Sequence, residues 1–143
     1  MAEGNTRALA ARLLQQVEMG RSMSGLLDSG LTGFPSRDAS LVKEFCFGVT
    51  RYWPQLDAIA GHLVNRPLKR RDADIRALIL LGLYQLRYMR VAPHAALAET
   101  VDAARTLKKP WAAGLINALL RRFQREQDDL MALVEAEPAA RYA

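Results

Sequence analysis

Residues 80–122 decide the fold of this chain, and they read LLGLYQLRYMRVAPHAALAETVDAARTLKKPWAAGLINALLRR. The stretch predicts three consecutive helices, because apolar residues recur every three or four positions and Pro93 and Pro110 interrupt the pattern. The first helix is apolar nearly all round, and the other two have one apolar face. Their core-facing positions hold Leu, Ile, Val and Ala, which leaves little room for catalytic groups. The stretch therefore indicates a rigid helical scaffold with positive charge at its helix ends.

The composition of the whole chain predicts the all-α fold class. The 143 residues suit one domain, and they include 23 Ala and 22 Leu against only 16 Val, Ile and Thr together. No segment alternates with period two for long enough to indicate a strand. We predict one helical domain over residues 1–137, and in residues 138–143 the start of a linker to a further domain. The last two helices expected are one through residues 115–123 and a separate acidic one around residues 130–134.

Capping residues mark several of the expected helix ends. Asn5 and Gly20 delimit a first helix, Ser36 or Asp38 caps the third, and Asp72 caps the fifth. The middle of that fifth helix is apolar on every side, so it should be the hub of the domain. It also contains Gly82, which costs a helix about 1 kcal/mol relative to alanine and so predicts that a neighbouring helix crosses closely there.

The charge is uneven along the chain. Residues 1–125 carry 19 Lys and Arg against 10 Asp and Glu, whereas residues 126–143 carry one Arg against five acidic residues. Arginine makes up 16 of the 20 basic residues, and its planar guanidinium suits phosphate recognition. A polyanionic partner is therefore expected, with nucleic acid as the first candidate.

Other classes of site are poorly supported. Cys46 is the only cysteine and His62 and His94 are the only histidines, so neither a disulfide nor a zinc site is expected. The N-terminus lacks the apolar run of a signal peptide, and the longest apolar run, residues 77–83, is too short for a bilayer. We expect a cytoplasmic protein without metal, membrane or bound cofactor.

Clusters of basic residues are the candidate nucleic-acid-binding sites. The strongest is the loop Lys69-Arg70-Arg71, where three consecutive cations repel one another unless an anion is present. A solvated connector is the alternative for this loop, and interaction with a helix dipole is the alternative for the arginines at residues 121–125. The remaining candidates are Arg7, Arg12, Arg76, Lys108, Lys109, Arg121, Arg122 and Arg125.

Phe47 is a possible base-stacking residue, because Lys43 and Arg51 flank it at i−4 and i+4. The alternative, which we favour, is that Phe47 packs against another helix. Cys46 lies on the apolar face of the same helix and should be buried and unreactive.

Other side chains are expected to have structural roles. Tyr84 and Tyr88 should pack, Asn117 should hydrogen-bond a facing helix, and Glu99 and Asp102 should form salt bridges rather than a pair of catalytic acids.

Five short strings carry a family resemblance that extends from about Arg7 to Phe123. They are FCFGVTR at 45–51, LGLYQL at 81–86, PHAA at 93–96, ETV at 99–101 and NALLRR at 117–122. In this order and spacing they resemble the NusB-like helical domains. Ala98 and the pair Arg121-Arg122 are similar to the branch found at the N-terminus of bacterial small-subunit (16S) rRNA cytosine-5 methyltransferases.

The resemblance implies two packed helical bundles that bind structured RNA and dock a methyltransferase domain, present in cis, on small-subunit rRNA. In that branch the S-adenosylmethionine site and the catalytic cysteines lie in a separate domain, and nothing in this chain matches them. Two alternatives remain open at this stage. One is a stand-alone antitermination factor that binds leader RNA and a ribosomal protein, and the other is a helical protein-interaction or homodimerisation module.

Overall fold

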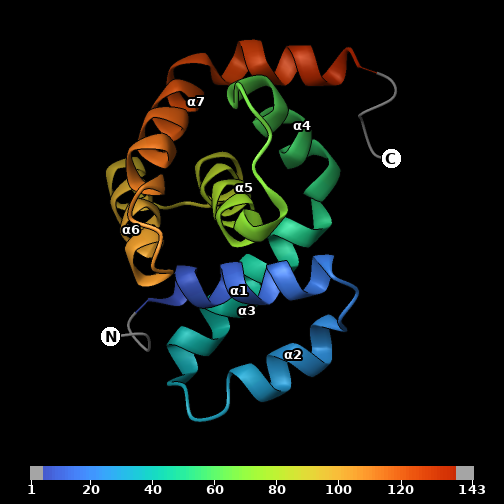
Figure 1. Ribbon diagram of the computed structural model, residues 1–143, viewed down its shortest axis with the longest axis vertical. Coiled ribbons are helices and arrows are strands. Elements are labelled where there is room, and N and C mark those ends of the chain that lie inside the picture. The colour runs from blue at the N-terminus through green and yellow to red at the C-terminus, as the bar shows by residue number, and fades with distance from the viewer. Residues whose placement is uncertain (1–4, 138–143) are drawn as a thin grey trace.

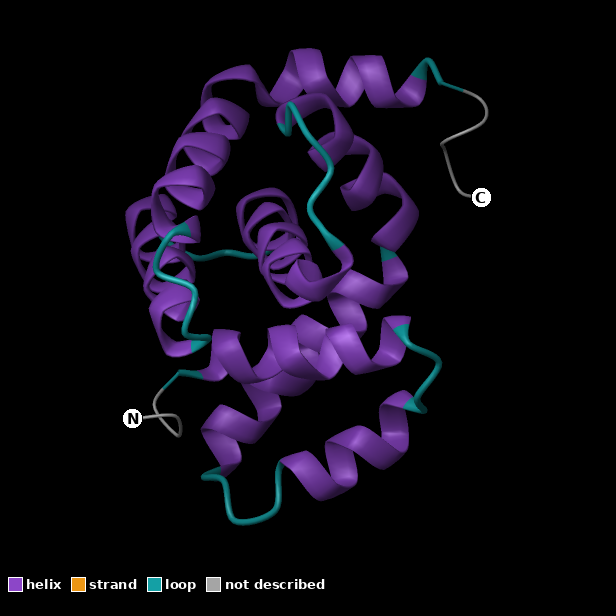
Figure 2. Cartoon of the chain, viewed as in Figure 1, coloured by secondary structure: helices purple, strands orange, loops and turns teal. Residues whose placement is uncertain are grey.

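A computed structural model describes residues 5–137, and helices make up most of this part of the chain (Figure 2). The elements are α1 (Thr6–Glu18), α2 (Met23–Gly30), α3 (Ser36–Arg51), α4 (Trp53–Leu63), the 3₁₀ turn η2 (Arg70–Asp72), α5 (Ala73–Tyr88), α6 (Pro93–Thr106) and α7 (Ala112–Glu135). No strand occurs among residues 5–137, so the all-α prediction is confirmed. The predicted linker, residues 138–143, lies outside the described residues.

Helix α5 is the hub, as its apolar sequence predicts. Every residue from Ala77 to Gln85 is buried, and the helix contacts α1, α3, α4, α6 and α7. Figure 1 shows α1–α3 grouped on one side of the molecule and α4–α7 on the other, with α5 in the middle of the second group. The two-bundle expectation therefore describes the arrangement well.

Two glycines allow close helix crossings. A Cβ at Gly82 would lie 2.8 Å from two methyl carbons of Leu120, which confirms the predicted crossing by a neighbouring helix, α7. A Cβ at Gly48 would lie 2.1 Å from Cζ of Tyr84, so α3 and α5 also depend on a missing side chain. This second crossing was not predicted, although Gly48 also lies inside a helix and carries the same signal as Gly82.

The capping predictions had mixed outcomes. Asn5 caps α1 by accepting a hydrogen bond from the Ala8 backbone N–H at 3.1 Å, and Gly20 closes the helix at φ +98°. The cap predicted for α3 was wrong, because Pro35 holds the N-cap position and Ser36 and Asp38 lie in the first turn. Asp72 does stand at the N-cap of α5, but its side chain makes no capping hydrogen bond. Its carboxylate pairs with Lys109 instead.

The expected division of the C-terminal segment into two helical parts is confirmed. Within α7 two helical stretches meet at a kink at Glu126, where the backbone leaves helical geometry (φ −116°, ψ 21°). Beyond the kink Leu130, Met131 and Val134 are buried, and α7 contacts α4. The bend lets the acidic second half of α7 run across α4 (Figure 1). None of the described helices combines the length and the apolar character that a bilayer crossing requires.

Cys46 is fully buried on α3, and burial raises the pKa of its thiol to about 12. The expectation of a buried, unreactive thiol is thus supported by the structure. We expect the folded protein to resist a thiol reagent such as dithionitrobenzoate at pH 8, because almost none of the thiol is ionised. The same reagent should label Cys46 fully in concentrated guanidinium chloride. Rapid labelling of the folded protein would contradict the assignment.

Candidate nucleic-acid interface

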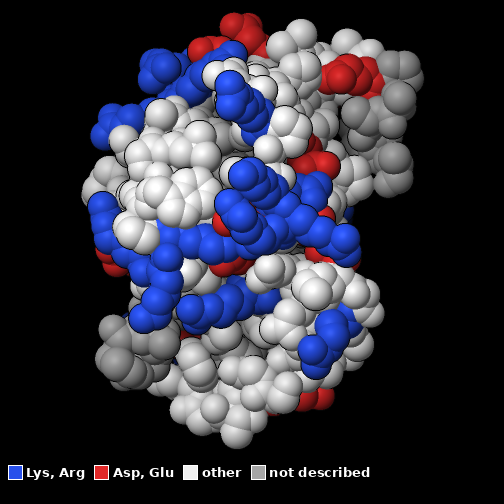
Figure 3. All heavy atoms as spheres, in the orientation of Figure 1, with Lys and Arg blue, Asp and Glu red and all other residues white. Residues whose placement is uncertain are grey.

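Basic side chains gather in a band across the middle of one face of the molecule (Figure 3). The band runs over α1, the segment before α5 and the α6–α7 connection. Two hydrogen bonds join these segments: an Arg12 NH2 group donates to the Thr106 carbonyl at 3.3 Å, and Lys109 Nζ donates to the Arg71 carbonyl at 2.8 Å. We call the exposed cations of this surface the basic belt, and its members are Arg12, Lys69, Arg70, Arg71 and Lys108.

The loop cations of the belt have no acidic partner within the described part of the chain. Lys69, Arg70 and Arg71 follow an irregular stretch that contains Pro67, and the short turn η2 directs them to the surface. All three side chains are exposed, and none forms an ion pair among residues 5–137. Three consecutive unpaired cations repel one another, so the loop is suited to a polyanion.

Lys108 and Lys109 are neighbours with different surroundings. Lys108 is exposed in the left-handed backbone region (φ 65°), and its side chain has no partner among residues 5–137. Lys109 is held by Oδ1 of Asp74 at 2.7 Å and Oδ1 of Asp72 at 3.1 Å, and its side chain is only 23% exposed. Lys109 therefore fastens the α6–α7 connection to the start of α5. Its RNA contact, expected from sequence, stays a prediction.

Replacing Lys109 by methionine should lower the free energy of unfolding by about 2 kcal/mol. The reason is that Asp72 and Asp74, both nearly buried, would lose their cation. Lys108→Met is the matched control and should change stability by less than about 0.5 kcal/mol. Urea unfolding of both variants measures the difference. Equal stabilities would refute the role of Lys109 in holding the α6–α7 connection against the start of α5.

The contribution of Lys109 to the free energy of unfolding should also depend on pH. Burial alone lowers the pKa of Lys109, but the hydrogen bonds and negative charges of Asp74 and Asp72 outweigh it and raise the pKa. A cation whose pKa is higher in the folded than in the unfolded state stabilises the fold fully at pH values below its unfolded pKa, which is near 10.4 for lysine. This stabilisation is lost as the pH rises through the pKa of the folded state. The stability gap between the wild type and Lys109→Met should therefore be constant near neutral pH and shrink above about pH 10.5.

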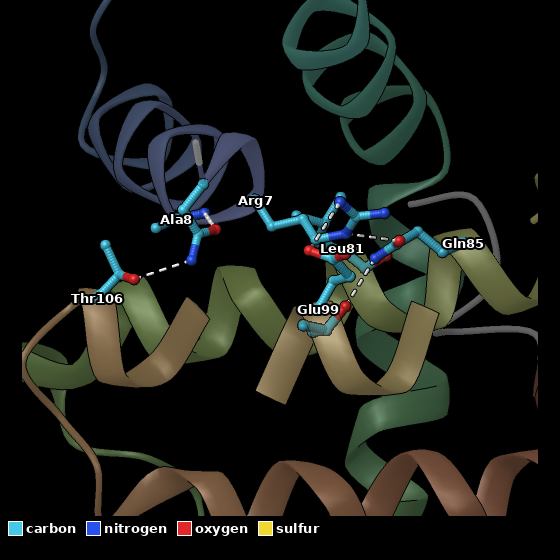
Figure 4. Close-up of polar contacts among 8 residues, drawn as sticks. Arg7, Ala8, Leu81, Gln85, Glu99 and Thr106 are labelled. Atoms are coloured by element: carbon cyan, nitrogen blue, oxygen red, sulfur yellow. Dashed lines mark hydrogen bonds and ion pairs between the residues drawn. The ribbon is translucent and has the colours of Figure 1, made fainter. Parts of the chain in front are cut away.

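Arg7 and Arg76, two further candidates, are engaged inside the fold. Arg7 Nε donates to Oε1 of Gln85 at 3.0 Å, a guanidinium nitrogen lies 3.9 Å from Glu99, and the side chain is only 13% exposed (Figure 4). Burial lowers the pKa of Arg7, while the Glu99 charge opposes that shift. Gln85 in turn donates to Oγ1 of Thr100 at 2.8 Å. This buried polar chain links α1, α5 and α6.

Arg76 joins α5 to two other helices, α1 and α4. It pairs with Asp57 at 2.9 Å and with Glu18, and its guanidinium lies 5.7 Å from the Trp53 ring centroid. Burial alone lowers the pKa of Arg76, but the two carboxylates together raise it. The guanidiniums of Arg7 and Arg76 thus already have partners, and their RNA roles stay predictions.

The arginines of α7 form a separate group. Arg122 pairs with Glu126 at 3.3 Å, Arg121 donates to Asn117 at 3.3 Å, and Arg125 is exposed without an ion pair among residues 5–137. Asn117 was expected to bond a facing helix, and this was wrong because its partner lies on the same helix. No hydrogen bond or ion pair among the described residues connects these arginines to the basic belt.

The exposed aromatic residues differ from expectation. Phe47 is 54% exposed, so its predicted packing against another helix was wrong, and base stacking there stays a prediction. Trp111, which sequence reasoning did not single out, is 55% exposed. Tyr84 and Tyr88 pack as expected: Tyr84 is buried, and Tyr88 stacks on Tyr52 with ring centroids 4.0 Å apart.

The acidic residues of α6 form salt bridges, as expected, although the expected partners were Arg105 and the arginines of α7. Glu99 pairs with Arg7 and Asp102 pairs with Arg105 at 3.5 Å. Among residues 5–137, no group of three or more histidine, cysteine or acidic side chains is arranged to hold a metal ion.

Comparison with known proteins identifies the family. Residues 4–125 match the NusB family. The chain is 47% identical to "Ribosomal RNA small subunit methyltransferase B" of Pseudomonas putida over 140 residues, which are 97% of this chain and 32% of that protein. Proteins of the same name from Erwinia tasmaniensis and Escherichia coli O1:K1 are each 45% identical, over 89% and 94% of this chain and 30% and 32% of theirs.

The chain thus spans about a third of the length of these relatives. The family match covers α1 to α6 and most of α7, which includes every segment of the basic belt. The chain belongs to the NusB family.

Proposed function

We propose that this chain is the RNA-binding part of a small-subunit rRNA cytosine-5 methyltransferase and docks that enzyme on its substrate in the cytoplasm. The observation that carries the proposal is the basic belt, in which three chain segments place five exposed cations on one face. Phosphates are the ligands that such a surface fits best, because each cation can neutralise one backbone charge.

The name of the relatives supports the choice of RNA and of the enzyme class. Methyl transfer itself, with S-adenosylmethionine as the donor, is assigned to sequence beyond this chain. Arg12 lies within α1, whereas the other belt cations lie in or beside the turn η2 and in the α6–α7 connection. Binding would therefore depend mainly on RNA shape and phosphate placement rather than on base sequence.

The direct test is the salt dependence of RNA binding. We expect this chain to bind fragments of small-subunit rRNA, with log K falling against log salt at a slope of about −0.7 to −0.9 for each phosphate contacted. Five belt contacts would give a slope of roughly −3.5 to −4.5. Fluorescence anisotropy at several potassium chloride concentrations measures it. Binding that is absent, or that is insensitive to salt, would refute the proposal.

A second test addresses the connection to an enzyme. An antibody against this domain should detect, in the source cells, a protein about three times heavier than 15.9 kDa, because the chain covers 32% of its relative. A band at 15.9 kDa itself would favour the antitermination alternative instead.

A further inference from the structure

A surface pocket of about 610 Å³ lies between the loop before α5 and the start of α7. Its apolar lining consists of Leu63, Val64, Pro67, Leu68, Trp111 and Leu115, and Arg66, Lys69 and Arg71 also line it. The volume falls within the range of small-ligand sites. The pocket shares Lys69 and Arg71 with the basic belt, so any polyanion on the belt runs past its opening.

Trp111 is the unusual member of this lining. It stands at the N-cap of α7, directly after Pro110, and 55% of its surface is exposed although the pocket beside it is apolar. A large aromatic ring left open next to unpaired cations is the pattern of a stacking platform for nucleic-acid bases.

We propose that this pocket holds one unpaired nucleotide of the bound RNA, with its base stacked on Trp111. The phosphates on either side would lie against Arg66, Lys69 and Arg71, which form no ion pair among residues 5–137. The Asn65 amide, also in the lining, has both a donor and an acceptor to offer a base edge. This assignment rests on the proposed RNA-binding function and adds single-stranded character to the substrate.

The charge of the pocket favours a nucleotide over an apolar protein segment. Among the described residues that line it, Asp72 alone is acidic, and Lys109 already neutralises that carboxylate. Three arginine or lysine side chains therefore surround an apolar floor without opposing charge. A nucleotide fits both features, because its flat base can pack on the apolar floor and its phosphates can pair with the cations.

The experiment uses tryptophan fluorescence and binding affinity together. The chain has two tryptophans, so Trp53→Phe leaves Trp111 as the only reporter. We expect a short single-stranded oligoribonucleotide from small-subunit rRNA to quench Trp111, and the same sequence in a duplex to leave it unquenched. Trp111→Ala should weaken single-strand binding by about 5- to 150-fold, the value of one base stack, whereas Trp111→Phe should retain most of the affinity. Circular dichroism checks that each variant is folded.

Leu133→Ala is the control, because Leu133 is a large apolar side chain of similar exposure (51%) on the second half of α7 and outside the pocket lining. It should leave single-strand affinity unchanged. If Phe47→Ala weakens binding and Trp111→Ala does not, the stack lies on α3 and the pocket assignment is overturned. If Trp111→Ala weakens duplex and single-strand binding equally, no unpaired base stacks on Trp111 and the proposal is overturned.

The remaining outcomes separate this inference from the proposed function. Salt-dependent rRNA binding that survives Trp111→Ala without quenching would overturn the pocket and leave the RNA-binding function intact. No RNA binding by the wild type would overturn both. Quenching by an acidic peptide but not by RNA would assign the surface to a protein partner, against the inference.

Discussion

Reversing the charge of Lys69, Arg70 and Arg71 to glutamate should weaken rRNA binding by at least about 100-fold and leave the free energy of unfolding nearly unchanged. Each replacement removes one phosphate contact and adds a repulsion, and the salt slope should fall in magnitude by about 2 to 3. Stability is spared because the three side chains are exposed and unpaired among residues 5–137. The hydrogen bond from Lys109 to this loop uses the carbonyl of Arg71 and survives the change.

A control variant with the same change in net charge distinguishes binding at the belt from nonspecific attraction of RNA to a positively charged protein. Arg37, Arg87 and Arg90 are exposed and form no ion pair among the described residues. Arg87 and Arg90 lie near the far end of α5, about 20 Å along its axis from the loop. Reversing these three charges should reduce affinity only a few-fold. If both triple variants lose affinity equally, net charge explains the binding and the belt has no special role.

Alanine at Gly48 should destabilise the fold by about 3 kcal/mol. The new Cβ would lie 2.1 Å from Cζ and 2.5 Å from Cε1 of Tyr84, well inside van der Waals contact. Tyr84 cannot easily move away, because it is buried beside Tyr52 and Tyr88. Overpacking of this kind typically costs 1 to 3 kcal/mol or more, so α3 and α5 would have to separate slightly.

Gly61→Ala is the matched control for this substitution. Gly61 lies inside α4, and a Cβ there would meet nothing within 4 Å. Alanine should therefore raise stability by up to about 1 kcal/mol through helix propensity alone. Urea unfolding of both variants measures the contrast. In addition, Tyr84→Leu should rescue part of the loss in Gly48→Ala, and strict additivity of the two changes would rule out the clash.

Local patterns predicted the features that depend on neighbouring residues. The apolar run of α5 indicated its central position, Asn5 and Gly20 marked the ends of α1, and Gly82 indicated a crossing. Each of these signals lies within one helix or its caps. The family resemblance added the two-bundle arrangement, which periodicity alone does not specify.

Contacts between distant segments were not predictable in this way. Lys109 meets Asp74 across 35 positions and Arg7 meets Gln85 across 78, so local sequence patterns cannot show that these cations have partners. A helical wheel shows which side of a helix a residue takes, but not whether another helix covers that side. The prediction that another helix covers Phe47 is therefore wrong. No sequence pattern indicated the equal exposure of Trp111.

The hydrogen bond from Lys109 to the Arg71 carbonyl also bears on the proposed RNA binding. It holds the segment that carries Lys108 next to the segment that carries Arg71, so the backbones of both are already in place. If the belt binds RNA as proposed, an RNA whose phosphates match these positions would bind without the full entropic cost of ordering either segment. The belt would then select for the path of the RNA backbone rather than for the identity of its bases.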